Sequence, residues 1–378
     1  MSIERDHRRA AIVALLLTAL LSLPLSGSVL AAGQATPATT APSPTPDPAA
    51  EALDRAIAYL IEQQADDGGF VGFEGVSDAG TTTDAILALK AAGIRGVATE
   101  SLISSAIGYL EDAAGEYASS GPGQAAKVTL AAVAAGKDPT QFAGIDLIAL
   151  ATAPVATPAA GTPAALVGPG GYGDDLYDHA LVLLALAAAG EPAPAEAIDA
   201  LRATQAEDGS WSFTGATDPG AGDSNTTALV IQALVATGNG DDPMIAAGLE
   251  GLRAMETVNG QFAFQASDPM LADANSTALA IQAIVAAGQD PSSADEWVNA
   301  ARGLAAFQNV SGAFRYQDSD PADNLLATLQ AIPAMAGLPL PISVACDATA
   351  SAETAQGTPV IALPAPASGE APCVEVAA

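Results

Sequence analysis

Two pairs of uncharged amide side chains stand out in otherwise apolar stretches of this sequence. Asn225 and Gln232 lie seven residues apart in DSNTTALVIQALVATG, and Asn275 and Gln282 have the same spacing in DANSTALAIQAIVAAG. Seven residues are close to two turns of an α-helix, so each pair shares one helix face. Because amides both donate and accept hydrogen bonds, these positions could bind a ligand rich in amides or hydroxyl groups.

A third amide, Gln330, matches Gln232 and Gln282 when ATLQAIPAMAG is aligned with LAIQAIVAAG. A buried amide that finds no partner costs about 1–3 kcal/mol. The three glutamines therefore either line a wet central cavity or hold adjacent helices together by bonding to their backbones. Asn225 and Asn275 stand at helix starts, where we expect them to cap free backbone N–H groups.

Acidic residues precede several apolar helices at matching positions, where a carboxylate caps the helix and complements its dipole. They are Asp78, Asp175, Asp223 and Asp273. If the helix starts meet at one rim, these carboxylates would line a mouth together with Tyr172, Tyr177 and His179. The candidate ligand-binding residues are Gln232, Gln282, Gln330, Asn225, Asn275, Asp175, Tyr172, Tyr177 and His179.

The elements that would position these residues recur along the chain. One motif, a helix ending in Gln or Glu followed by Gly-x-aromatic, occurs four times. Its copies are Gln64, Gly68 and Phe70; Gln205, Gly209 and Trp211; Glu256, Gly260 and Phe262; and Gln308, Gly312 and Phe314. A polar turn and a second helix ending in Gly follow each copy. With two degenerate units at 105–136 and 142–190, the sequence predicts six helix pairs.

The two helices of each pair differ in composition. The second helix is rich in Ala and apolar on nearly every side, whereas the first alternates apolar and charged residues. A helix that is apolar all round is buried. We therefore predict an all-α fold over residues 51–340: a closed α/α toroid, or (α/α)6 barrel, with the second helices as its inner ring. The alternative is an open solenoid, which would need capping repeats with polar outer faces.

The repeated motif resembles the QW motif of the prenyltransferase and squalene-cyclase repeat superfamily, and the resemblance covers residues 51–340. In that superfamily the Gln bonds to the end of a neighbouring helix and the aromatic ring stacks beside it. The resemblance thus implies structural roles for Gln64, Gln205 and Gln308. Trp211 keeps the family's Trp, whereas the other three copies carry Phe.

The superfamily's chemistry requires residues that this sequence lacks. Its zinc-dependent prenyltransferases use Asp, Cys and His ligands, but the chain has two histidines and both its cysteines follow the repeats. The Asp-x-Asp-Asp acid of class II terpenoid cyclases and the Gly-Cys-Gly-Glu-Gln stretch of complement thioester domains are also absent. We therefore expect no metal, no cofactor and no catalytic residue.

What remains is the non-catalytic branch, which includes the secreted cobalamin carriers. The resemblance then implies a toroid that binds a bulky ligand, corrinoid-like or apolar, or a partner, without chemistry. The carriers' C-terminal β-domain has no counterpart here. A terpenoid-cyclase-like or prenyltransferase-like enzyme acting on a polyprenyl substrate is the alternative, and a scaffold for protein contacts is a third.

The two ends of the chain are unlike the repeats. Residues 1–32 have the basic, apolar and small-residue segments of a secretory signal peptide, with an uncleaved anchor as the alternative. Residues 33–50 are rich in Pro and Thr, which predicts a linker. Residues 341–378 form a Pro- and Ala-rich tail, in which we expect Cys346 and Cys373 to form a disulfide.

The charge of the chain limits its partners. It has 12 Lys and Arg against 43 Asp and Glu, a formal net charge of −31. Such a surface repels nucleic acid and anionic lipid and disfavours a diphosphate substrate. We expect a secreted or surface-associated monomer with a bulky small-molecule ligand, no nucleic-acid partner, and no insertion of the mature domain into a membrane.

Overall fold

The computed structural model describes residues 48–72, 74–154, 158–267 and 269–342. Within these residues it contains twelve α-helices, one short 3-10 helix, and isolated β-bridges in place of strands. None of the described helices is both long and apolar enough to cross a membrane. The predicted signal peptide and both cysteines lie outside the described residues, so the pairing of Cys346 with Cys373 stays a prediction.

The helices alternate between an outer and an inner set. The outer helices are α1 (Pro48–Ile61), α3 (Glu100–Ser119), α5 (Leu147–Ala151), α7 (Ala195–Ala203), α9 (Pro243–Arg253) and α11 (Ala300–Ala305). The inner helices are α2 (Ala79–Ile94), α4 (Pro122–Ala134), α6 (Leu176–Ala189), α8 (Ser224–Ala236), α10 (Ala274–Ala286) and α12 (Leu325–Met335). The 3-10 helix η1 (Ala164–Leu166) lies between α5 and α6. The predicted all-α fold is confirmed.

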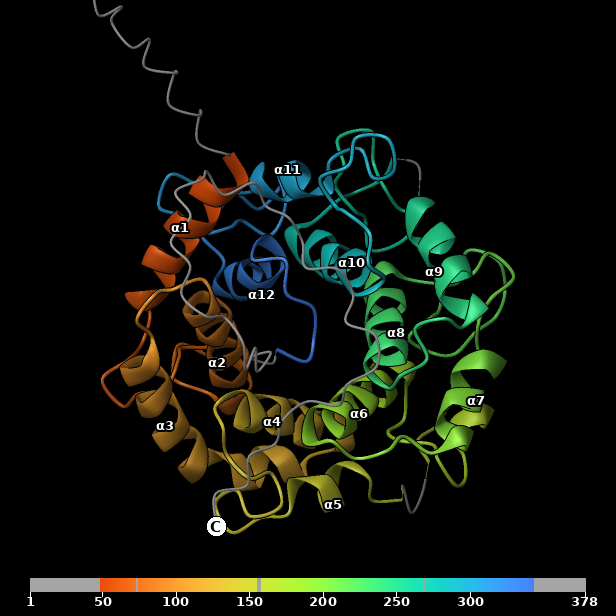
Figure 1. Cartoon of the computed structure of the whole chain (residues 1–378), viewed down its shortest axis with the longest axis horizontal. Helices are drawn as coiled ribbons and strands as arrows, with labels where there is room; N and C mark the ends of the chain where they lie inside the picture. The colour runs from red at the N-terminus through yellow and green to blue at the C-terminus, as the bar shows by residue number, and fades with distance from the viewer. Residues whose placement is uncertain (1–47, 73, 155–157, 268, 343–378) are drawn as a thin grey trace, which may run out of the picture. The chain divides into compact units, whose positions relative to one another are not determined.

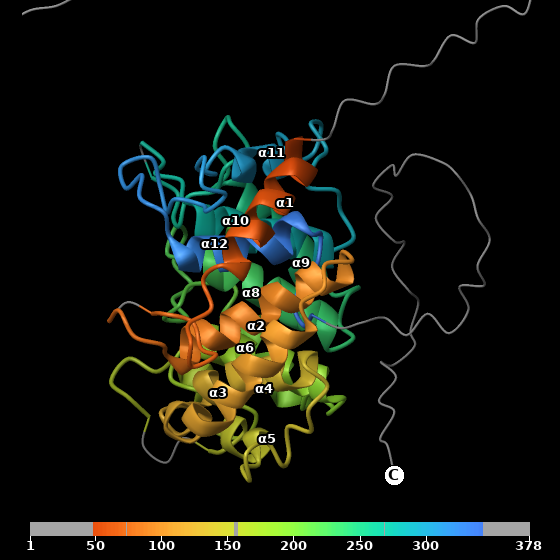
Figure 2. The same cartoon turned by 90° about the vertical axis from the view of Figure 1, so that its left-hand side faces the viewer.

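The six inner helices form a ring that the outer helices surround (Figure 1). Each inner helix packs against the next one along the chain, and α12 packs against α2. Figure 2 shows the ring from the side, with long loops extending from one edge. Small side chains let the inner helices approach closely, and many are fully buried, among them Ala88, Ala131, Ala185, Ala233 and Ala283.

The glutamines of three motif copies hold the outer helices together, as the family resemblance implied. The Nε2 atom of Gln64 donates to the carbonyls of Gly68 and Leu102, at 2.8 and 2.9 Å. Gln205 bonds in the same way to Gly209 and Met244, and Gln308 to Gly312 and Ala52. The motif aromatics Phe70, Trp211, Phe262 and Phe314 are fully buried. The motif is therefore a structural clamp.

The motif glycine is required by space as well as by backbone conformation. Gly209 has φ 84°, and a Cβ atom there would lie 2.0 Å from the carbonyl oxygen of Ala247 in α9. A side chain at this position would push the neighbouring outer helix away and break the clamp of Gln205.

Candidate functional site

Aspartate side chains cap four of the inner helices. Each accepts a hydrogen bond of 2.7–2.8 Å from the backbone N–H three residues further on; the four are Asp78, Asp175, Asp223 and Asp273. Their predicted capping role is confirmed. The prediction that Asn225 and Asn275 are the caps is wrong, because the preceding Asp already occupies the cap position. Both asparagines are the second residue inside the helix.

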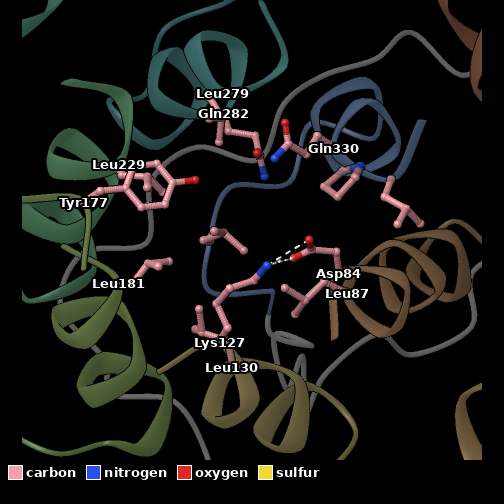
Figure 3. Close-up of a pocket in the computed structure, with 13 residues that line it drawn as sticks. Asp84, Leu87, Lys127, Leu130, Tyr177, Leu181, Leu229, Leu279, Gln282 and Gln330 are labelled. Carbon is pink, nitrogen blue, oxygen red and sulfur yellow. Dashed lines mark hydrogen bonds and ion pairs between the residues drawn. The ribbon is translucent and has the colours of Figure 1, made fainter. Parts of the chain in front are cut away.

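Counting from the cap residue gives a common register for the inner helices. The residues six positions after the cap are Asp84, Lys127, Leu181, Leu229, Leu279 and Gln330. All six line one central cavity, so this position points toward the axis of the ring (Figure 3). The residues nine positions after the cap, one turn deeper, include Leu87, Leu130, Gln232 and Gln282.

The central cavity is small and mostly apolar. Its volume is about 90 Å³, which holds only a few water molecules. Ligand pockets usually measure about 300–1,000 Å³. Leucines supply most of its wall, and Tyr177 and Gln282 contribute polar atoms (Figure 3). A corrinoid or a polyprenyl chain does not fit this cavity as it stands.

An ion pair lies in the wall of the central cavity. Both carboxylate oxygens of Asp84 are 2.9 Å from Nζ of Lys127, and the two side chains are 17% and 25% exposed (Figure 3). Burial alone would lower the pKa of Lys127, but the Asp84 carboxylate raises it above its ordinary value. Lys127 is therefore charged at every physiological pH. This pair was not predicted from the sequence, although each residue is a charged side chain within an apolar inner helix.

Two of the predicted glutamines hold the segment that follows the last helix. Gln282 Nε2 donates to the carbonyl of Leu338 at 2.9 Å, and Gln232 Oε1 accepts from the N–H of Leu340 at 2.9 Å. Leu340 also lines the central cavity. Gln232 and Gln282 therefore attach this segment across the ring, which agrees with a clamping role.

The third glutamine does not share their position. Gln330 lies six residues after its cap Asn324, whereas Gln232 lies nine residues after Asp223. The alignment that equated them is wrong by one helical turn, because it matched the sequence letters around Gln instead of the helix starts. Gln330 points toward both the central cavity and the rim.

A larger and more polar pocket opens at the rim, where the inner helices begin. Its volume is about 390 Å³. Its polar side chains are those of Tyr177, Asn225, Asp273, Asn275, Ser276, Tyr316, Asn324 and Gln330. Phe264 and Tyr316 come from the loops that precede α10 and α12. Inside the pocket, Nδ2 of Asn275 donates to Oε1 of Gln330 at 2.7 Å, so these two amides are held in a fixed orientation.

The rim pocket offers hydrogen bonds without a positive charge. Of the described residues that line it, none is Lys or Arg. Burial raises the pKa of Tyr177 to about 12, so its hydroxyl keeps its proton and can donate. Burial also raises the pKa of Asp273, against the hydrogen bonds from Ser276 that lower it. Such a site suits a neutral ligand with several hydroxyl groups.

Four of the predicted site residues lie outside both pockets: Gln232, Tyr172, Asp175 and His179. His179 is fully buried, accepts from the N–H of Tyr172 at 3.3 Å through Nδ1, and bonds through Nε2 to the Ala197 carbonyl at 3.0 Å. Burial lowers its pKa to about 4, so it is neutral. The Tyr172 ring stacks on it at 5.6 Å, and Asp175 caps α6. Hydrogen bonds within the chain thus engage His179 and Asp175 without a ligand, and Tyr172 packs against the His179 ring.

The ring of inner and outer helices places the chain in the α/α-toroid class of folds. It is similar to the type II terpene cyclase MstE from Scytonema in its apo form, with 15% identity and a TM-score of 0.54 over 76% of this chain and 98% of that one. It is also similar to a glycosidase variant in complex with glucose, with 14% identity and a TM-score of 0.53 over 77% and 98%.

A protein from Actinoplanes matches as well, with 18% identity and a TM-score of 0.52 over 76% of this chain and 99% of that one. No protein-family model and no curated protein matches the sequence. At these identities the likeness shows the fold alone. The toroid fold expected from the QW-like motif is confirmed.

Proposed function

We propose that this protein binds a neutral, hydroxyl-rich ligand of the sugar class in its rim pocket. Two features of the rim pocket carry the proposal: its aromatic rings, Phe264 and Tyr316, and its amide side chains. The amides are those of Asn225, Asn275, Asn324 and Gln330. Amides pair with hydroxyl groups both as donors and as acceptors, and an aromatic face packs against the C–H face of a sugar ring. The signal-like residues 1–32 support export of such a binding protein.

The pockets support this ligand class better than a corrinoid or an apolar molecule. The more apolar space is the central cavity, at about 90 Å³, whereas the rim pocket of about 390 Å³ is larger and more polar. The sugar class is also in line with the glucose bound by one of the similar glycosidase structures.

We propose binding rather than glycoside hydrolysis, because hydrolysis uses two carboxyl groups on either side of the scissile bond. Among the described residues that line the rim pocket, Asp273 is the one carboxylate. It accepts hydrogen bonds from the N–H and the hydroxyl of Ser276 at 2.7 and 2.8 Å. An Asp so engaged in capping α10 has little freedom to act as an acid or a nucleophile.

Titration calorimetry with neutral hexoses tests the proposal. We expect the wild-type protein to release or absorb heat with at least one hexose, and both Asn275→Ala and Gln330→Ala to weaken binding about tenfold or more. Val310→Ser, on an exposed outer loop, is the matched control and leaves affinity unchanged. An absence of binding across the panel of hexoses, by a protein shown to be folded, would overturn the proposal.

A second candidate is an enzyme that acts on a polyprenyl substrate, as the fold shared with type II terpene cyclases suggests. One observation favours it: Asp84 projects from an inner helix into the central cavity. Both its oxygens are bound by Lys127, so it has no proton to donate in this arrangement. Incubation with geranylgeranyl compounds, followed by mass spectrometry and chromatography, tests it. Cyclised product that disappears in Asp84→Asn would support the enzyme.

A further inference from the structure

Three successive motif copies are each followed, two residues after the motif aromatic, by an aromatic side chain that is exposed. These residues are Phe213, Phe264 and Tyr316, which are 48%, 44% and 37% exposed. The motif aromatics before them are fully buried. In each copy the first aromatic ring is buried and the second, two residues later, is exposed. Packing of the core therefore explains the first ring but not the second.

The backbone fixes these three aromatics at the starts of consecutive inner helices. The carbonyls of Phe213, Phe264 and Tyr316 accept hydrogen bonds of 3.1, 2.9 and 2.8 Å from the first N–H groups of α6, α8 and α10, respectively. The next residue in each helix is Tyr177, Asn225 or Asn275. Each of these three helix starts therefore combines one exposed aromatic ring with one polar side chain of the rim.

A further hydrogen bond holds the backbone of Phe213 in place. The N–H of Phe213 donates to Oδ2 of Asp223 at 3.0 Å, while Oδ1 of the same carboxylate caps α8 at 2.7 Å. Asp223 thus links the loop of Phe213 to the start of α8. Phe213 itself lies outside the rim pocket, whereas Phe264 and Tyr316 line it.

The aromatic arc does not extend to the first motif copy. The corresponding residue there is Gly72, where a Cβ atom would lie 1.4 Å from Oδ2 of Asp78. No side chain fits at that position without moving the cap of α2. Among the described residues, the exposed aromatics that follow a motif copy are therefore the three at the starts of α6, α8 and α10.

We propose that Phe213, Phe264 and Tyr316 form an extended surface for a chain of neutral sugars, of which the rim pocket holds one end. The inference rests on the proposed function and adds to it that the ligand is an oligosaccharide rather than a single sugar. Neighbouring packed helices lie about 8–10 Å apart, so the arc across three of them is longer than one sugar ring.

The chemistry of the arc favours neutral sugars over charged ones. Each of the three helix starts offers an aromatic face for the C–H side of a sugar ring and a polar side chain for the hydroxyl groups of that sugar. The net charge of −31 disfavours sulfated or uronic-acid chains.

Calorimetry with sugars of two lengths tests the arc separately from the rim pocket. Neutral hexoses are compared with the hexasaccharides built from them, on the wild-type chain, Phe213→Ala, Phe264→Ala and the control Val310→Ser. We expect the wild type to bind the hexasaccharide more tightly than the hexose. Phe213→Ala should weaken hexasaccharide binding about tenfold while leaving hexose binding unchanged. Phe264→Ala should weaken both.

The outcomes separate the two proposals. Equal affinity for short and long sugars, with no effect of Phe213→Ala, would overturn the arc and leave the rim pocket standing. If neither length binds, the proposed function fails and the arc fails with it. Unchanged circular dichroism and melting temperature of Phe213→Ala show that a lost interaction reflects binding and not unfolding. Because Phe213 is half-exposed, we expect Phe213→Ala to leave both measurements unchanged.

Discussion

Asp84 of α2 and Lys127 of α4 stand at the same position of their helices, six residues after the cap, and form an ion pair at 2.9 Å. Three of the other four inner helices carry a leucine at this position, Leu181, Leu229 or Leu279, and α12 carries Gln330. The ion pair thus replaces part of a layer that is otherwise apolar except at Gln330. Charge at this depth is costly unless it is paired, so each partner depends on the other.

We expect single replacements in this pair to be destabilising and the double replacement to be tolerated. Asp84→Leu leaves a buried ammonium, and Lys127→Leu leaves a buried carboxylate, each at a cost of about 2–4 kcal/mol in the free energy of unfolding. The double variant continues the leucine layer and should match or exceed the wild type. Urea denaturation of the three variants measures this. Additive losses in the double variant would contradict the coupling.

The glutamines should separate into two groups in the same kind of experiment. Gln232→Leu and Gln282→Leu leave the N–H of Leu340 and the carbonyl of Leu338 without their partners, which should cost about 1–3 kcal/mol each. Gln330→Leu removes a side chain that faces the pockets and should change the unfolding free energy by less than about 1 kcal/mol. Equal losses in all three variants would show that Gln330 is also a clamp.

Much of the fold could be predicted because it follows from short local patterns. The motif Gln-x-x-x-Gly-x-aromatic marks the end of an outer helix, and the Ala-rich segments after it are apolar on every side. These features gave the helix pairs, the toroid and the clamps of Gln64, Gln205 and Gln308. The Asp caps could be predicted for the same reason, since a cap depends on the three residues that follow it.

The candidate site could be predicted only in part, because it depends on which residues of six helices face one axis. The sequence singled out Asn225, Asn275, Tyr177 and Gln330 as candidate ligand-binding residues, and all four line the rim pocket. The alignment of similar residues around Gln placed Gln330 one turn too deep in α12. The position of a residue along an inner helix has to be counted from the start of that helix. The partnership of Asp84 with Lys127 joins residues 43 positions apart, which no local pattern contains.

The single histidine of the described residues should not titrate near neutral pH. Its buried ring holds the pKa of His179 at about 4, well below its ordinary value of 6.5. The folded state thus binds fewer protons than the unfolded state between these values, so this group lowers stability as pH falls from about 6.5 to 4. In NMR spectra we expect the imidazole C–H chemical shifts of His179 to stay constant between pH 5.5 and 8, at values typical of a neutral ring. A midpoint near 6.5 would contradict the buried, neutral role.

Glu256 stands where the other three motif copies carry the clamping Gln, and it cannot bond in the same way. An ionised carboxylate has no proton to donate to a carbonyl, and among the described residues Oε1 of Glu256 is buried with no hydrogen-bond partner. Burial raises the pKa of Glu256 to about 7, although Arg253 lowers it. Protonation would supply the donor that this copy lacks. The clamp between α9 and its neighbour should therefore depend on pH.

We predict that stability falls as pH rises from about 4.5 to 7 at this site. In that window the folded state retains the proton that the unfolded state has released, so the contribution is complete below 4.5 and lost above 7. Glu256→Gln supplies a permanent donor and should be more stable than the wild type at pH 8, by about 1–3 kcal/mol, with the difference vanishing near pH 4. The reverse change, Gln205→Glu, is the matched control and should introduce a slope of the same sign. Urea denaturation gives the free energy of unfolding of both proteins at each pH. Because all other groups titrate equally in both, the difference between wild type and Glu256→Gln isolates the carboxyl of Glu256. A difference that stays constant from pH 4 to 8 would show that Glu256 is an anion throughout and would contradict the prediction.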